Sequence, residues 1–140
     1  MKKLLILLLA LPLLAACGAP KNAANRAASV ELGLLDGLYI LQSVNGGAVA
    51  WECLPEIKFS EGMQVSGQVC NRFIGPGTYE NGVLTVPNMA MTMMLCVDDK
   101  LNQLERDFAV MMRDGARVDL EKDTLTLSGE TLTLVYMRVV

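Results

Sequence analysis

Apolar and polar residues alternate along most of the chain after residue 37, and this period of two constrains the fold more than any other feature. Side chains of a β-strand point alternately to the two faces of a sheet, so the alternation predicts strands with one buried face. It is clearest near the C-terminus, where Lys122-Asp123 and Ser128-Gly129-Glu130 separate three runs as turns. The runs predict an antiparallel meander with these apolar positions: Val118, Leu120, Leu125, Leu127, Leu132, Leu134 and Tyr136.

Shorter alternating segments come earlier in the chain, beginning with Leu38, Ile40 and Val44. Asparagine and glycine accept positive φ, so Asn45-Gly46-Gly47 and Asn81-Gly82 are expected hairpin turns. Glu61-Gly62 is a further expected hairpin connection. The strands expected from these signals cover residues 38–44, 57–59, 63–69 and 83–86.

One segment has a helical period instead. Its apolar residues recur at intervals of three and four: Leu101, Leu104, Phe108 and Met111. Asp98 is expected as the N-cap, Asp99 complements the helix dipole, and Gly115 suits the left-handed residue that ends many helices. The pattern predicts one amphipathic helix near residues 98–114.

The fold class expected is therefore α+β, with a curved antiparallel β-sheet of about seven to eight strands packed on that single helix. Residues 32–140 are expected to form one domain, because this length suits one hydrophobic core and is too short for two.

The N-terminus has the pattern of a secretory signal. Lys2 and Lys3 precede an apolar run, Leu4 to Leu14, which is about half the ~20 residues that a membrane span requires. The following Leu14-Ala15-Ala16-Cys17 matches bacterial lipoprotein signals, so residues 1–16 are expected to be cleaved and Cys17 lipidated. The alternative is an ordinary signal peptide that is cut elsewhere and leaves Cys17 free.

Residues 17–31 are rich in alanine and small polar residues and are expected to be a flexible tether. Several acyl chains hold a protein on a membrane permanently, so the expected location is lipid-anchored on the outer membrane, facing the periplasm. Gly18, in place of an acidic residue after the cysteine, favours the outer membrane over the inner one. The chain has no cluster of Lys or Arg, which argues against a nucleic-acid partner.

The chain contains no histidine, and this absence excludes the Ser-His-acid and Cys-His catalytic arrangements. The cysteines lack zinc-site spacing and no phosphate-binding glycine loop is present, so neither a metal nor another cofactor is expected. The methionines between Met89 and Met94 could bind a soft metal, but they also fill irregular cores well. The chain is therefore expected not to be an enzyme; a hydrolase that works without histidine is the least favoured alternative.

After export, Cys53, Cys70 and Cys96 enter an oxidising compartment, where only two of the three can pair. Cys70 follows a predicted strand and Cys96 precedes the helix, so a Cys70–Cys96 disulfide is the favoured pairing and Cys53 stays single. The alternative is that all three are buried, unpaired thiols.

Five motifs follow one another along the chain: Ser43-Val44-Asn45-Gly46, Ile57-Lys58-Phe59, Val65-Ser66-Gly67-Gln68-Val69-Cys70-Asn71-Arg72-Phe73, Ala90-Met91-Thr92-Met93-Met94-Leu95-Cys96 and Leu125-Thr126-Leu127. Together they resemble the META-domain family, over about residues 36–136. The resemblance implies a small α+β domain and an association with heat-shock expression and novobiocin resistance. No catalytic activity is established for the family. Family cysteines match Cys70 and Cys96, whereas Cys53 is an addition of this chain.

Asn71, Arg72 and Thr92 are the candidate functional surface, because they belong to the sharpest of these motifs. The alternative gives them structural roles, with Asn71 in a turn, Arg72 in an ion pair and the Thr92 hydroxyl bonded to the backbone. The leading hypothesis is a monomeric, non-enzymatic lipoprotein of the stress response that supports outer-membrane integrity through an envelope protein or lipid. The second hypothesis is a periplasmic module that binds a small ligand, a misfolded chain or a protease.

Overall fold

The computed structural model describes residues 33–140, which form one long helix, α2 (Asp99–Asp114), and eleven strands. A short 3-10 turn, η1 (Glu61–Met63), joins two of the strands. The strands in chain order are β1 (Gly37–Val44), β2 (Gly47–Ala48), β3 (Glu56–Ser60), β4 (Gln64–Gln68), β5 (Arg72–Pro76), β6 (Thr78–Glu80), β7 (Val83–Thr85), β8 (Ala90–Met91), β9 (Ala116–Glu121), β10 (Thr124–Ser128) and β11 (Thr133–Arg138).

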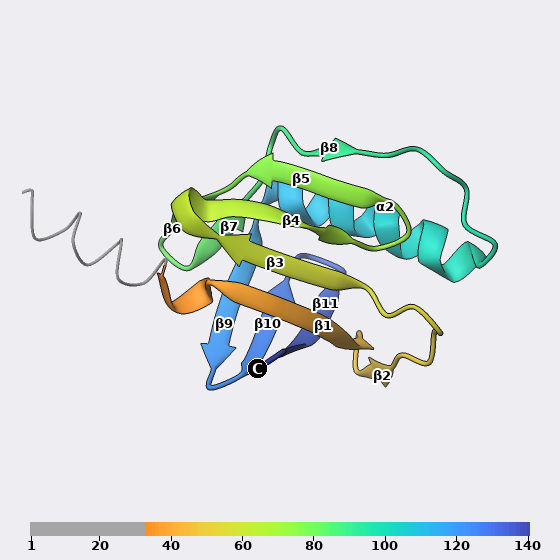
Figure 1. The fold of residues 1–140 in the computed structure, drawn as a ribbon, viewed down its shortest axis with the longest axis horizontal. Helices are drawn as coiled ribbons and strands as arrows, with labels where there is room; N and C mark the ends of the chain where they lie inside the picture. Colours follow the sequence, from red (N-terminus) through yellow and green to blue (C-terminus); the bar gives the residue numbers. More distant parts are fainter. Residues whose placement is uncertain (1–32) are drawn as a thin grey trace, which may run out of the picture.

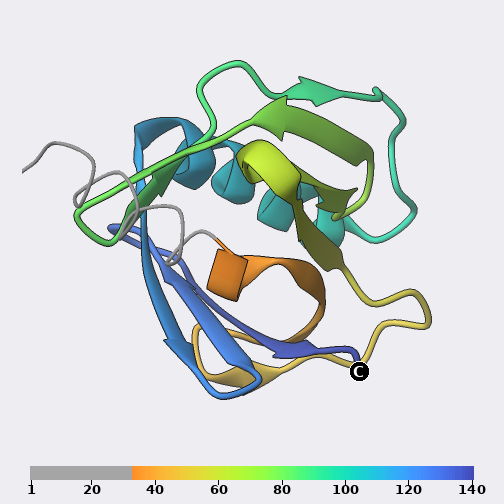
Figure 2. The same cartoon turned by 60° about the vertical axis from the view of Figure 1, so that its left-hand side comes forward.

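All strands belong to one antiparallel sheet in the order β6-β7-β9-β10-β11-β1-β3-β4-β5-β8, with β2 paired to β1. β1 lies near the middle of this path and pairs with the last strand, β11, on one side and with β3 on the other. The sheet curls, so that its β3–β5 half and its β9–β11 half face each other at an angle with α2 packed inside the curve (Figure 1; Figure 2). This agrees with the expected curved sheet on a single helix.

The core fills the space between the helix and the concave face of the sheet. From α2 it receives Leu104, Phe108, Met111 and Met112. The side chain of Asp98 accepts a hydrogen bond from the backbone N–H of Lys100 at 2.8 Å, and Gly115 donates its N–H to the Met111 carbonyl at 2.8 Å. The caps expected from the sequence therefore bound the helix. Fully buried sheet residues include Tyr39, Leu41, Ile57, Phe59, Val65, Leu84, Leu125, Leu127, Leu134 and Tyr136.

Two expectations about the sheet are corrected. The sheet has eleven strands instead of seven to eight, because β2, β6 and β8 contain only two or three residues, too few to show a period, and β5 ends in glycine and proline. In β1 the fully buried side chains are Tyr39 and Leu41, whereas Leu38 and Ile40 lie on the outer face, half-buried. The register of β1 shifts between Leu41 and Ser43, which interrupts a simple alternation.

Gly67 allows β3, β4 and β5 to approach closely. A Cβ atom at this position would lie 2.2 Å from the backbone oxygen of Glu56 and 2.8 Å from the ring of Phe73. No side chain fits there, so only glycine permits this packing.

The signal peptide, Cys17 and the tether expected at residues 17–31 lie outside the described residues. Within residues 33–140, no helix has the length and apolar character needed to cross a membrane.

Candidate functional site

Asn71 and Thr92, two residues of the candidate surface, meet at the turn between β4 and β5. Asn71 is buried, and its side-chain oxygen accepts hydrogen bonds from the Met94 N–H at 2.7 Å and from the Thr92 hydroxyl at 3.1 Å. Its side-chain amide donates to the Met94 carbonyl at 2.8 Å and to the Glu105 carboxylate at 2.7 Å. Asn71 therefore binds the segment after β8 to both the sheet and the helix.

Glu105 completes this arrangement from α2. Its Oε2 atom accepts the backbone N–H groups of Cys70 and Asn71, the first at 3.0 Å. A carboxylate with backbone donors makes charge-assisted hydrogen bonds, which are stronger than neutral ones. The turn is thereby held against the second turn of the helix.

A disulfide and a second asparagine hold the far end of the same segment. Cys70 and Cys96 are joined, with their Cα atoms 6.0 Å apart, and this is the pairing that the sequence favoured. Asn102 in α2 accepts the Cys96 N–H at 3.0 Å and donates to the Cys96 carbonyl at 2.8 Å. Cys53 is exposed and unpaired.

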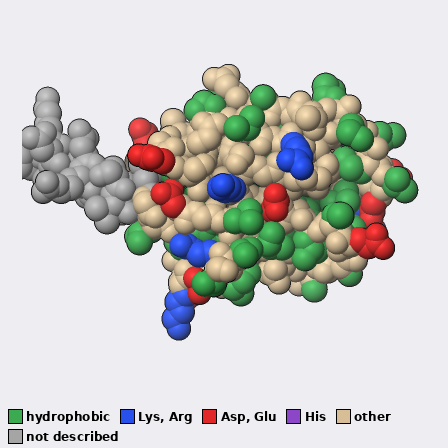
Figure 3. Space-filling model, viewed as in Figure 1, with side chains coloured by type: hydrophobic (Ala, Val, Ile, Leu, Met, Phe, Trp, Pro, Cys, Tyr) green, Lys and Arg blue, Asp and Glu red, His purple; other side chains and the backbone are tan. Residues whose placement is uncertain are grey.

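Residues 93–97, which contain these attachment points at Met94 and Cys96, are a strongly exposed apolar segment that we call the apolar loop. Its exposed fractions are 95% for Met93, 74% for Met94, 87% for Leu95 and 106% for Val97. Hydrophobic side chains gather at this end of the molecule, where β8 leads into α2 (Figure 3). An apolar segment that is fixed by hydrogen bonds and a disulfide, yet exposed to water, is typical of a binding surface.

Arg72 takes a different position from its two companions. Only its backbone joins the arrangement: the N–H donates to the Thr92 hydroxyl and the carbonyl accepts the Thr92 N–H, both at 3.0 Å. Its side chain is exposed on the outer face of β5. An ion pair was the alternative, structural role expected for Arg72. Neither of the ion pairs found among residues 33–140 involves this residue.

A hollow of about 600 Å³ lies between the β1–β2 turn and the start of α2. Trp51 and Asp98 both line it, and the indole N–H of Trp51 donates to Asp98 at 2.8 Å. The Lys100 backbone N–H and then this indole lower the pKa of Asp98 below its usual value, so the carboxylate stays ionised at neutral pH. Apolar walls come from Val44, Val49, Leu104 and Leu132.

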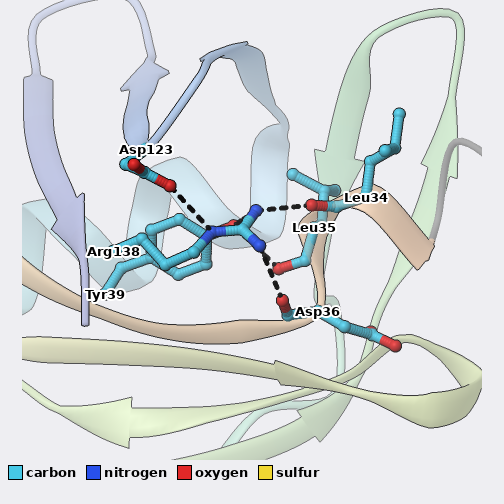
Figure 4. Close-up of polar contacts among 6 residues, drawn as sticks. All are labelled: Leu34, Leu35, Asp36, Tyr39, Asp123 and Arg138. Carbon is cyan, nitrogen blue, oxygen red and sulfur yellow. Dashed lines mark hydrogen bonds and ion pairs between the residues drawn. The ribbon is translucent and has the colours of Figure 1, made fainter. Parts of the chain in front are cut away.

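The side chain of Arg138 holds residues 34–36, where the described part of the chain begins (Figure 4). One of its terminal nitrogens donates to the Leu34 carbonyl and to the Tyr39 hydroxyl, both at 2.6 Å, and the other donates to the Asp36 carbonyl at 3.3 Å. The guanidinium also lies 5.0 Å from the centre of the Tyr39 ring. The last strand therefore anchors the residues at which the described chain begins.

Residues 34–36 and the apolar loop lie at opposite ends of the longest axis of the domain (Figure 1). The turned view keeps them apart (Figure 2). The apolar loop therefore lies far from the point where the described chain begins.

Several residues that hold these contacts were not predicted from the sequence. Asn102 and Glu105 lie in an otherwise ordinary amphipathic helix, and Arg138 lies near the end of an alternating strand. Asn102 gives the one usable sign, since a polar residue on the buried side of a helix requires a partner. Within residues 33–140, no three His, Cys, Asp or Glu side chains are grouped closely enough to hold a metal ion.

Comparisons with known proteins cover most of the chain. Residues 32–139 match the model of the META domain. The chain is 44% identical over 99 residues to heat shock protein HslJ of Escherichia coli (strain K12), covering 70% of this chain and 71% of that protein.

Two solved NMR structures have a similar fold. One is 42% identical, with a TM-score of 0.68, and the match covers 74% of this chain and 90% of the other. The second, from Burkholderia xenovorans, has a TM-score of 0.62 over 79% of this chain and 88% of its own. It is only 21% identical, so its likeness concerns the fold alone.

Proposed function

Because the chain belongs to the META domain family, we propose that it is a heat-shock-related envelope lipoprotein that binds another protein through its apolar loop. The proposed role is non-enzymatic support of outer-membrane integrity, which includes resistance to novobiocin. Lipidation at Cys17 would hold the domain on the periplasmic face of the outer membrane. The name of its Escherichia coli relative supports the heat-shock connection.

The exposure of the apolar loop is the observation on which this proposal rests. Exposed side chains of Met93, Met94, Leu95 and Val97 cost solvation free energy in the isolated domain, and a partner that covers them recovers it. Methionine adapts to irregular surfaces, which suits a protein contact. The fixed loop also loses little conformational entropy on binding, because Asn71, Asn102 and the disulfide already order it.

The position of the loop favours a protein over the anchoring membrane as its partner. The described chain begins at the end of the domain that Arg138 fixes, and the apolar loop lies at the other end (Figure 1). A tether that leaves residue 33 towards the membrane would therefore present the loop to the periplasm.

The absence of histidine supports a role without catalysis. Two carboxylates at this end of the domain already have structural partners: Asp98 caps α2, and Glu105 bonds the turn at Asn71. A carboxylate that holds backbone donors is poorly placed for acid–base work on a substrate.

The test is complementation of a deletion strain, with novobiocin sensitivity as the measurement. The native lipoprotein should restore resistance, whereas a Met94→Gln, Leu95→Gln double variant should fail although it retains the disulfide and side chains of similar size. Met137→Gln is the matched control, since Met137 is also exposed but lies in β11, outside the loop. Resistance restored equally by the loop variant would refute the proposal.

A soluble form, residues 18–140 behind a cleavable signal, separates the two parts of the proposal. Rescue by the lipoprotein alone indicates that the anchor is required. Equal rescue by the soluble form indicates binding in the periplasm without a membrane role.

The hollow beside Trp51 favours a second candidate function, a periplasmic module for a small ligand. Its volume of about 600 Å³ lies within the range of small-molecule sites, and it combines apolar walls with polar groups from α2. Trp51→Phe separates the two candidates, because it removes the indole donor to Asp98 and leaves the apolar loop unchanged. Loss of resistance in this variant, with resistance retained in the loop variant, would favour the ligand module.

A further inference from the structure

The outer face of the sheet has a second surface feature, a groove that crosses β3, β4, β5 and β8. Its volume is about 600 Å³. The pairing register sets its floor: Leu38, Lys58, Ser66 and Ile74 lie opposite one another on four neighbouring strands. The next outward-facing row lies two residues further along the strands. There Glu56 on β3 and Arg72 on β5 lie on either side of Gln68 on β4. We call this site the outer groove.

Two basic side chains stand over this groove. Lys58 and Arg72 are the only basic residues between positions 33 and 99, and both line it. Both are exposed, and neither takes part in an ion pair or a side-chain hydrogen bond within the described part of the chain. Figure 3 shows basic side chains over β3 to β5, with an acidic side chain close beside them.

The distance between these two cations suits one anionic group. β3 and β5 are separated by β4, so their backbones lie about 10 Å apart, and two residues along the strand add about 7 Å. Long Lys and Arg side chains span this gap from both sides. The Ser66 hydroxyl lies between them on β4, and Glu56 is the one acidic side chain among the lining residues.

Apolar side chains extend the groove beyond the cations. Ile74 is half exposed on β5 and pairs with Ala90 on β8. Met91 lines the edge of the groove at β8. The groove therefore has basic side chains at one end and apolar surface at the other. A ligand with an anionic group and an apolar tail would fit both parts.

We propose that the outer groove binds an anionic amphiphile, in which a carboxylate or phosphate lies between Lys58 and Arg72 and a short apolar tail covers Ile74 and Ala90. The guanidinium of Arg72 provides parallel donors that fit either oxyanion, and Lys58 adds a point charge. The volume suits a small amphiphile rather than an extended polymer. No residue of the apolar loop lines this groove, although Thr92, directly before the loop, does, and the proposal does not depend on the partner described above.

The test uses three soluble probes with one tail: hexanoate, hexyl phosphate and the uncharged hexanol. The lipidated protein is held in zwitterionic nanodiscs, and binding is followed by the methyl NMR signals of Ile74 and Met91. Both anionic probes should shift these signals, and hexanol should shift them much less. Arg72→Gln and Lys58→Gln should each weaken binding roughly tenfold, as expected for loss of a charge-assisted hydrogen bond.

Arg117→Gln is the matched control, because Arg117 is exposed on β9, away from the groove. Inorganic phosphate measures how much the apolar tail contributes to binding. Because it has no tail, it should bind more weakly than hexyl phosphate. Equal binding of phosphate and hexyl phosphate, equal binding of hexanol, or variants at Lys58 and Arg72 that bind like the control would each overturn the proposal. Binding of an acidic peptide in preference to both amphiphiles would overturn it too.

Discussion

The Glu105 carboxylate accepts hydrogen bonds from both the backbone and the side chain of Asn71, 34 positions earlier in the chain. This pair joins α2 to the β4–β5 turn, and Asn71 extends the connection to Met94 through two further hydrogen bonds. Sheet, helix and apolar loop therefore depend on one buried amide.

Replacing Asn71 by alanine should destabilise the domain by about 3 kcal/mol, because alanine cannot replace the hydrogen bonds that the buried Asn71 side chain forms with the Glu105 carboxylate and the Met94 backbone. Urea denaturation measures this change, and the amide of Met94 should also exchange faster with solvent. Asn88→Ala is the control, since Asn88 is exposed and makes no side-chain hydrogen bond in the described chain. A stability equal to that control would show that the Asn71 contacts contribute nothing.

The Cys70–Cys96 disulfide should contribute about 3.5 kcal/mol by chain entropy, given its sequence separation of 26. A Cys70→Ser, Cys96→Ser double variant should therefore unfold at a lower urea concentration. Proteolysis within the apolar loop should also become faster, because one attachment of the loop is lost. Cys53→Ser should retain native stability, since Cys53 is exposed and unpaired. An unchanged double variant would argue against a stabilising role for the bond.

The elements that could be predicted from the sequence are those fixed by local physics. α2 has apolar residues at helical spacing between Asp98 and Gly115, and the observed caps lie at those two residues. β10 and β11 alternate regularly, because one face of each is buried and the other is not. Both predictions used only patterns among residues that are close together in the sequence.

The remaining features depend on contacts between distant residues. Two-residue strands such as β2 and β8 form only because a longer strand offers them an edge. The importance of Asn71 was predicted from its motif, but its partner Glu105 was not, since a surface-like glutamate in a helix gives no sign of a turn far away. The exposure of residues 93–97 was also missed, because apolar composition by itself predicts burial.

Arg138→Ala should release residues 34–36 from the sheet and cost about 3 kcal/mol, because the guanidinium bonds two of their carbonyls and the Tyr39 hydroxyl. Hydrogen exchange should increase most over residues 35–41. Arg138→Lys should recover only part of the loss, since one ammonium cannot replace the planar fork. Arg117→Ala, on exposed β9, is the control. Exchange that rises equally across all strands would contradict this local role.

The buried tyrosines should make the protein sensitive to alkali. Burial raises the pKa of Tyr136 well above the usual value of a tyrosine. Burial also raises the pKa of Tyr39, although the nearby Arg138 opposes this. An unfolded tyrosine ionises near pH 10, whereas the folded one stays protonated to a higher pH. The stabilising contribution is therefore complete below about pH 10 and is lost as the pH rises through the folded pKa.

Tyr136→Phe tests this dependence, because it keeps the buried ring and removes the ionising hydroxyl. The free energy of unfolding of the native protein should fall above about pH 10, and the variant should lose less over the same range. Tyr79→Phe, at a half-buried position, controls for loss of a hydroxyl and should leave the alkaline decline in place. Tyrosinate absorbance of the folded native protein should appear at a higher pH than that of the urea-unfolded chain. If both states ionise together, burial of Tyr136 does not govern the alkaline transition.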